Sequence, residues 1–332
     1  MTLTGNLDDI AVYNSVVNGV VTITAVPKTK GTFKEVEPVS INSNATLSQS
    51  CDIHTGVRTI TLTNITGNVN VTFYGTYSYD LITEFTVNAR ESVRMLYLYF
   101  NSSDKEKILR IREGDEDIPV TSTHSWDEGG KHILRYSFTN HTVPYDMFND
   151  VKAITAIEIG DCVTSLESYA FKGTSIERVV IPETITSFGS SLFYDCVHLK
   201  HAVLPKGITE IYDSMFRGCE SLQSIDIPEG VTRFGDFAYD GCSSLASIIL
   251  PAGVTYVGNY CFSACSNLRH IVSFPVRTPT LGGTYRYNFT SVARNGVLAV
   301  PAAAKTGSNY SYWVASNVNL GSYGWTLVYM DE

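Results

Sequence analysis

Histidine, cysteine and carboxylate side chains are the groups of this 332-residue chain that could hold a metal ion or transfer protons. Seven histidines are scattered along it, and the closest set is His124, His132 and His141. These three lack the i, i+4 spacing that puts two ligands on one helix face, so we expect structural or solvent-facing roles and no metal site. The sequence also lacks a nucleophile elbow, a phosphate-binding loop, an EF-hand loop and a dinucleotide-binding glycine set. We therefore predict no catalytic residues, no cofactor and no enzymatic activity.

Carboxylates offer two weaker possibilities. The run Asp115, Glu116 and Asp117 after Gly114 could bind Ca²⁺, which takes several carboxylate oxygens, or could be a solvated turn. Glycoside cleavage needs two carboxyl groups only about 5 to 10 Å apart in space, and an acidic chain offers many such pairs. A polysaccharide-cleaving enzyme therefore stays open as an alternative.

Four of the seven cysteines recur at intervals of 23 residues: Cys196, Cys219, Cys242 and Cys265. Metal-binding cysteines usually come in closely spaced pairs, and no C-x-x-C pair is present. Free cysteine is among the most buried residue types. The spacing therefore predicts a ladder of small buried thiols, one per repeat, without disulfide bonds.

The cysteines belong to a longer repeated unit. Aligned on an Ile/Leu-Pro pair, it reads roughly I-P-x-G-V-T-x-F-G-x-x-x-F-x-x-C-x-x-L-x-x-I-x, and its copies start at Ile181, Leu204, Ile227 and Leu250. A degenerate copy starts at Ile159. A fixed period in the twenties indicates a solenoid, in which stacked units build one continuous core.

Within the unit, Leu222, Ile225 and Ile227 predict a short strand with these side chains inward. Proline, which has no backbone donor, ends the strand. Two places further on, glycines suit a turn with an unusual backbone angle: Gly207, Gly230 and Gly253. Recurrent aromatic residues should form a buried stack: Phe171, Phe193, Phe216, Tyr239 and Phe262.

If the apolar residues of the repeat strands point inward, the residues between them form two outward columns. The first column is Arg178, His201, Ser224, Ser247 and His270, and the second is Val180, Val203, Asp226, Ile249 and Val272. Strands stack about 4.8 Å apart, so the second, mostly apolar column would be a stripe roughly 20 Å long. An exposed apolar stripe indicates an interface, although β-branched residues are also favoured in strands for their own sake.

The repeat carries a family resemblance. Units such as "IPEGVTRFGDFAYDGCSSLASIIL" resemble the leucine-rich repeats of the BspA type, found on bacterial surface proteins and in some phage and protist proteins, over about residues 150 to 275. The tail "GVLAVPAAAKTGSNYSYWVASNVNLGSYGWTLVYM" resembles the closing segment of that family, which implies a C-terminal cap. Aromatic residues crowd this cap and either close the core or form a glycan-binding tip at Tyr285, Tyr287, Tyr312 and Trp313.

Before residue 145 the apolar period changes to two. "GVRTITLTNITGNVNVTFYG" places two alternating runs around a Thr-Gly-Asn turn, which predicts an antiparallel hairpin. Residues 1–78 resemble immunoglobulin-like (Ig-like) modules of phage tail and gut bacterial surface proteins, and the resemblance rests mainly on "TITLTNITGNVNVTF". On "EFTV", "GDEDIP" and "THSWDEGGKHILRYSF", residues 79–145 resemble a PKD-type sandwich, with "REGDED" where that family has "WGDG". We expect two β-sandwich modules with separate cores.

Composition restricts the partners. A hydrophobic content of 44% predicts an ordered, core-forming chain. The net charge of −9 and the lack of a basic run argue against nucleic acid and anionic membrane, and no apolar run is long enough to insert into a bilayer. Residues 1–10 lack the basic and apolar regions of a signal peptide, so we expect a non-secreted protein or one whose leader was removed.

The predicted architecture is a mostly β chain: an Ig-like module over 1–78, a PKD-like module over 79–145, a solenoid of about five repeats over 146–275 and a cap over 276–332. The expected function is non-enzymatic recognition, with the repeat face binding a protein or glycan on a cell surface, or neighbouring virion subunits, and with homo-oligomers as an option. We expect a virion surface or an extracellular or cell-surface location, as a phage attachment or decoration protein. The alternatives are a bacterial cell-surface adhesin of the gut Bacteroidetes type, a purely architectural subunit and the enzyme named above.

Overall fold

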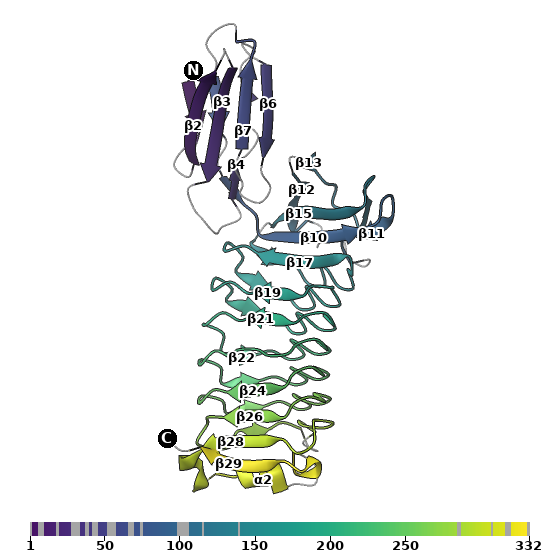
Figure 1. Ribbon diagram of the computed structural model, residues 1–332, viewed down its shortest axis with the longest axis vertical. Helices are drawn as coiled ribbons and strands as arrows, with labels where there is room; N and C mark the ends of the chain where they lie inside the picture. Colours follow the sequence, from purple (N-terminus) through teal and green to yellow (C-terminus); the bar gives the residue numbers. More distant parts are fainter. Residues whose placement is uncertain are drawn as a thin grey trace.

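The computed structural model describes residues 79–97, 106–114, 116–138, 140–283, 287–306, 308–315 and 320–330, together with short segments between residues 2 and 78. Nearly all of the described elements are strands, which confirms the mostly β fold class (Figure 1). The helices in these ranges are the short α2 (Tyr310–Ala315) and two 3-10 turns, η1 (Ala302–Lys305) and η2 (Leu320–Tyr323).

The N-terminal segments form nine strands: β1 (Thr2–Gly5), β2 (Ile10–Val17), β3 (Val20–Pro27), β4 (Lys34–Val36), β5 (Ser40–Ile41), β6 (Thr46–Cys51), β7 (Arg58–Thr63), β8 (Asn70–Phe73) and β9 (Thr76–Ser78). They pair as β2-β3-β7-β6, β1-β8-β5 and β4-β9. The predicted hairpin between the two runs around the Thr-Gly-Asn turn is wrong, because β7 lies between β3 and β6 whereas β8 pairs with β1 and β5. The chain therefore passes from one sheet to another between these strands.

The next segment is not a sandwich with its own core. Its main sheet has the order β13-β12-β15-β10-β17, and a two-stranded sheet joins β11 to β14. The strands are β10 (Leu81–Val87), β11 (Ser92–Arg94), β12 (Ile108–Glu113), β13 (Glu116–Asp117), β14 (Thr123–Ser125), β15 (Gly130–Phe138) and β17 (Ile154–Ile159). Strand β17 already belongs to the repeats, so one sheet crosses the join predicted near residue 145.

Strand β10 lies inside the five-stranded sheet. Alternate residues of β10, including Leu81 and Phe85, are buried, and the strand pairs with β15 on one edge and with β17 on the other. Because both edges of β10 are paired, the sheet does not end at β10 but continues into β17. The buried apolar side chains form one cluster from Leu81 to Trp325, so residues 79–138 and the solenoid share a core.

The solenoid stacks its coils through two ladders of parallel strands. One contains β19 (Arg178–Val180), β21 (His201–Val203), β24 (Ser247–Leu250), β26 (His270–Ser273), β28 (Val297–Pro301) and β29 (Thr326–Met330). The other contains β16 (Thr142–Val143), β18 (Ser165–Leu166), β20 (Ser187–Phe188), β22 (Glu210–Ile211), β23 (Arg233–Phe234), β25 (Tyr256–Val257) and β27 (Thr280–Leu281). The strand predicted around Ile225 is not formed, although Leu222 and Ile225 are buried as expected.

The predicted aromatic stack is confirmed and is longer than expected. Neighbouring ring centroids lie 5.5 to 5.8 Å apart, with interplanar angles of 4° to 13°. The buried rings are Phe148, Phe171, Phe193, Phe216, Tyr239, Phe262 and Phe289. Trp313 packs on the last ring at 5.4 Å and Tyr136 meets the first edge-on, so aromatic side chains cover both ends of the stack.

The predicted thiol ladder is also confirmed. Each of its four cysteines is fully buried, and its Sγ donates a hydrogen bond of 3.1 Å to a carbonyl oxygen of the aromatic stack. The acceptors are the backbone oxygens of Phe171, Phe193, Phe216 and Tyr239. Burial raises the pKa of Cys196 to about 12, so this thiol stays neutral in the folded protein.

The glycines chosen from the sequence are not the ones that the turns require. Gly207, Gly230 and Gly253 do not have positive φ angles. The left-handed positions recur elsewhere in each coil, for example at Gly218, where φ is +70°. A Cβ at Gly218 would also lie 2.2 Å from Asp195 Oδ1, so both the turn and the neighbouring coil exclude a side chain there.

Candidate functional site

The strand face of the solenoid gathers the ten residues predicted from the sequence. Strand register places Arg178 beside His201 and Val180 beside Val203. Further along, Ser247 lies beside His270 and Ile249 beside Val272. Ser224 and Asp226 occupy the coil between these two pairs and are exposed. We call this surface the strand face, defined by Arg178, Val180, His201, Val203, Ser224, Asp226, Ser247, Ile249, His270 and Val272.

The apolar column of the strand face is half-exposed. The exposed fractions are 47% for Val180, 46% for Val203 and 51% for Ile249, whereas Val272 is partly buried. Asp226 interrupts the column in the coil where no strand forms. Three branched apolar side chains thus face solvent, with the carboxylate of Asp226 between Val203 and Ile249.

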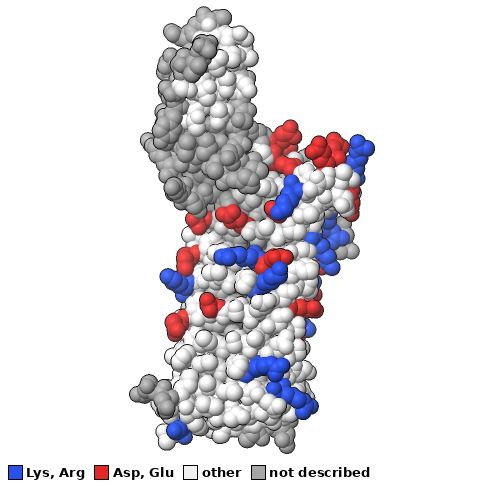
Figure 2. All heavy atoms as spheres, in the orientation of Figure 1, with Lys and Arg blue, Asp and Glu red and all other residues white. Residues whose placement is uncertain are grey.

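The polar column and its flank carry charges of both signs. Lys200 Nζ lies 2.9 Å from Glu177 Oε2, and this hydrogen bond lowers the pKa of Glu177. Figure 2 shows acidic and basic side chains mixed over the upper coils of the solenoid, and basic side chains on a largely uncharged surface near its lower end. A surface of this kind selects a partner by shape and local charge pairing more than by a strong field.

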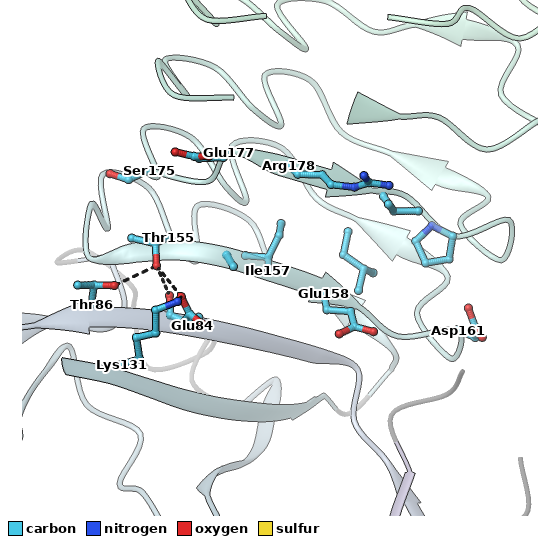
Figure 3. Close-up of a pocket in the computed structure, with 14 residues that line it drawn as sticks. Glu84, Thr86, Lys131, Thr155, Ile157, Glu158, Asp161, Ser175, Glu177 and Arg178 are labelled. Carbon is cyan, nitrogen blue, oxygen red and sulfur yellow. Dashed lines mark hydrogen bonds and ion pairs between the residues drawn. The ribbon is translucent and has the colours of Figure 1, made fainter. Parts of the chain in front are cut away.

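A groove of about 810 Å³ opens at one end of the strand face, where Arg178 and Val180 form part of its wall (Figure 3). It lies between the five-stranded sheet, which ends at β17, and the sheet that starts at β19. Ala156, Ile157 and Pro182 contribute apolar surface to it. Strands β17 and β19 belong to different sheets, although the backbone nitrogen of Ser175 donates a hydrogen bond of 3.0 Å to the carbonyl oxygen of Ile154.

The two ends of the groove differ in charge (Figure 3). At one end Lys131 Nζ lies 2.9 Å from Glu84 Oε1, and Thr155 Oγ1 donates to the same carboxylate oxygen at 3.3 Å. At the other end lie Glu158 and Asp161. Partial burial, and secondarily the charge of Asp161, raises the pKa of Glu158. This acidic end would be stabilised by a basic group of a partner.

The predicted aromatic tip loses one of its four residues. Trp313 is only 2% exposed and packs between Phe289 and Tyr310, so its assignment to a binding tip is wrong and it closes the core instead. Tyr287 stacks on Tyr260 at 5.2 Å, and Tyr312 is exposed. Tyr285 lies outside the described residues.

The other candidates from the sequence have structural partners. His132 stacks on Trp126 at 4.6 Å, and the edge of His124 meets the same ring. Asp117 accepts a hydrogen bond of 2.7 Å from Arg110, which lowers the pKa of Asp117. Its carboxylate is thus already paired with a cation, and Asp115 of the suggested Ca²⁺ run lies outside the described residues.

The groove residues were missed by the sequence analysis. Glu84 and Lys131 are distant from the repeats along the chain, and only the pairing of β10 with β17 brings them there. Ala156 and Glu158 could have been found, because β17 has the same inward and outward alternation as the later strands. Extending the two outward columns by one coil would have placed both residues on the strand face.

A stack of short parallel strands with a repeated buried side chain in every coil defines a leucine-rich-repeat solenoid. Residues 141–273 match the BspA type leucine rich repeat region in 6 copies, so this part of the chain is a repeat region of that type. The matched region contains one copy more than the expected five, and its first copy begins at residue 141. That first copy keeps Phe148 of the aromatic stack but lacks the Ile-Pro pair and the cysteine on which the repeats were aligned.

Three solved structures resemble parts of the chain. A leucine-rich repeat protein from Bacteroides ovatus is 21% identical, with a TM-score of 0.40, over 56% of this chain and 52% of that protein. A leucine rich cell surface protein from Faecalibacterium prausnitzii is 37% identical, with a TM-score of 0.34, over 35% and 31%. The Leucine Rich Repeat protein of T. pallidum is 24% identical, with a TM-score of 0.31, over 37% and 69%. The chain thus spans about half of the first of these proteins and a third of the second.

No curated protein sequence matches the chain. Among the described residues, the helices are too short and too polar to cross a membrane.

Proposed function

We propose that this chain is a surface-displayed recognition protein that binds a protein partner through its strand face. The observation that carries this proposal is the half-exposed column of Val180, Val203 and Ile249 beside a polar column on the same face of the stacked coils. Exposed apolar surface with a polar border is typical of protein interfaces. The binding is non-enzymatic.

A protein partner fits the strand face better than a glycan does. Sugar-binding surfaces depend on aromatic faces, which give large, rigid contact area. The two columns contain only aliphatic, hydroxyl, imidazole and charged side chains. The aromatic residues that suggested a glycan include Trp313, which is buried. A peptide or protein surface that presents apolar residues, with a basic group toward Glu158 and Asp161, would complement the strand face and its groove.

The place of display is a virion or a bacterial surface. The resemblance of the repeats to the BspA type supports surface display. The resemblance of "TITLTNITGNVNVTF" to phage tail modules favours the virion, as an attachment or decoration protein. An antibody against this chain that labels intact virions would support this placement, and labelling of bacterial cells free of phage would overturn it.

The binding proposal is tested by charging the apolar column. In the double variant Val203→Lys and Ile249→Lys, two ammonium groups would have to be desolvated on binding, so we expect capture by intact bacterial cells to fall at least tenfold. Val197→Lys is the matched control, because Val197 is an exposed valine (37%) outside the two columns. Unchanged capture by the double variant, with unchanged mass by light scattering, would overturn the proposal.

A further inference from the structure

We propose that Asp80, His141 and Cys162 form a binding site for a zinc-like divalent transition-metal ion. Asp80 lies just before β10, His141 follows β15 and Cys162 follows β17. These three strands are neighbours in one sheet (Figure 1). The site therefore lies where residues 79–138 join the first coils of the solenoid.

The three potential ligand atoms are already close together. His141 Nδ1 lies 2.6 Å from Asp80 Oδ1, and Cys162 Sγ lies 3.3 Å from the same oxygen. All three ligand atoms lie within 4.8 Å of one another. In a tetrahedral zinc site, bonds of about 2.0 Å to oxygen or nitrogen and about 2.3 Å to sulfur put ligand atoms roughly 3.3 to 3.5 Å apart.

The imidazole of His141 must move for the three ligand atoms to accept the ion. The distance from Cys162 to Asp80 already fits, whereas the imidazole must move away from the carboxylate by roughly 0.7 Å. The side chain of His141 is 56% exposed, so neighbouring atoms leave it room to move. The ion would replace the protons that now link the three groups, and a water molecule would fill the fourth position.

The ligand set selects the class of ion. One thiolate, one imidazole and one carboxylate suit Zn²⁺ or Co²⁺, whereas Ca²⁺ and Mg²⁺ prefer oxygen ligands alone. Asp80 is 2% exposed, and a buried carboxylate is stabilised by a neighbouring positive charge. Its second oxygen, Oδ2, accepts a hydrogen bond of 2.5 Å from the backbone nitrogen of Phe138, which fixes its orientation as outer contacts do in metal sites.

The cysteine of this site differs from the others that the structure describes. Cys196, Cys219, Cys242, Cys261 and Cys265 are fully buried. Burial raises the pKa of each of these five thiols, which disfavours the thiolate that a metal requires. Cys162 is partly exposed at a site open to solvent. The repeat pattern does not explain this cysteine, because it lies outside the 23-residue series.

The test is titration of the purified, reduced chain with Co²⁺, followed by competition with Zn²⁺. We expect one ion per chain, a thiolate-to-cobalt charge-transfer band that Zn²⁺ removes, and a higher melting temperature with Zn²⁺ bound. Cys162→Ser should abolish the band. His141→Asn should weaken binding at least tenfold, and because asparagine tolerates the φ of +50° at this position, the variant should still fold.

Cys51→Ser is the matched control, since it removes a cysteine that is not part of the proposed site, and we expect the band to persist in that variant. Wild-type chain that binds neither ion at 100 µM would overturn the proposal. A band that survives Cys162→Ser, or binding that is unchanged in His141→Asn, would overturn it as well. Neither readout depends on a partner of the strand face, so the result is independent of the proposed recognition function.

Discussion

Removal of one ring from the middle of the aromatic stack should destabilise the solenoid strongly. Phe216 is fully buried, and its ring lies 5.7 Å from Phe193 and 5.5 Å from Tyr239. Truncation of a buried phenylalanine to alanine costs about 3 to 5 kcal/mol, from lost transfer free energy and the cavity that remains. Contacts with two stacked neighbours place this ring well within that range. We expect Phe216→Ala to lower the free energy of unfolding by about 4 kcal/mol.

Urea titration followed by tryptophan fluorescence measures this loss. Trp126 lies in the shared core near β15, and Trp313 and Trp325 lie in the C-terminal cap, so the signal reports both ends of the shared core. With an m-value near 3 kcal/mol/M, the midpoint should fall by roughly 1.3 M. Because each coil contacts only its neighbours, a fault in the middle should also separate the unfolding of the two ends.

The matched control is Phe274→Ala, which removes the same side chain from the surface. Phe274 is 44% exposed, so we expect it to cost less than about 1 kcal/mol. A loss below about 1 kcal/mol for Phe216→Ala, or equal losses for the two variants, would refute the view that the ring stack is the main source of solenoid stability.

The thiols and the groove support three further predictions. Burial keeps the pKa of the buried thiols above the ordinary 9.0, so at high pH they ionise in the unfolded chain before they ionise in the folded one. The melting temperature should therefore be constant between about pH 7 and 8 and should fall as pH rises from about 9 toward 12. A constant melting temperature up to about pH 11 would contradict this. The same five thiols should resist a thiol reagent at pH 8 until denaturant is added. We expect the wild type to release reducing sugar from polysaccharides only at background level, and Glu158→Gln to leave that level unchanged. If the wild type releases sugar and Glu158→Gln abolishes the release, the enzyme alternative would be supported.

The interior of the repeats was predictable because it is periodic. Each position of the 23-residue unit meets its own copy in the next coil, so the aromatic stack and the thiol ladder follow from residues such as Phe193 and Cys196 without further information. The same logic gave the ten outward residues of the strand face. The periodicity did not predict the turn geometry. Asp195 and Gly218 occupy equivalent positions in successive coils and both have positive φ angles, although only one of them is a glycine.

The junction was not predictable, because it depends on pairing between distant strands. The residues of Leu81–Val87 do not by themselves indicate that β10 pairs with β17, so the sequence predicted neither the shared core nor the groove. The same pairing brings Asp80 to His141 and Cys162, which are separated from it by 61 and 82 positions. In the sequence, His141 is closest to His124 and His132, so its spacing gave no sign that Asp80 and Cys162 are its neighbours in space.

Site-specific photo-crosslinking can show whether the strand face binds a protein partner. A photoreactive amino acid would replace Val203 or Ile249 in separate chains, with Val197 as the control position. Each chain would be irradiated on intact bacterial cells. We expect a covalent adduct with the same partner protein from both strand-face positions and none from the control position. Adducts from the control position alone, or from no position while the chain still attaches to cells, would contradict it.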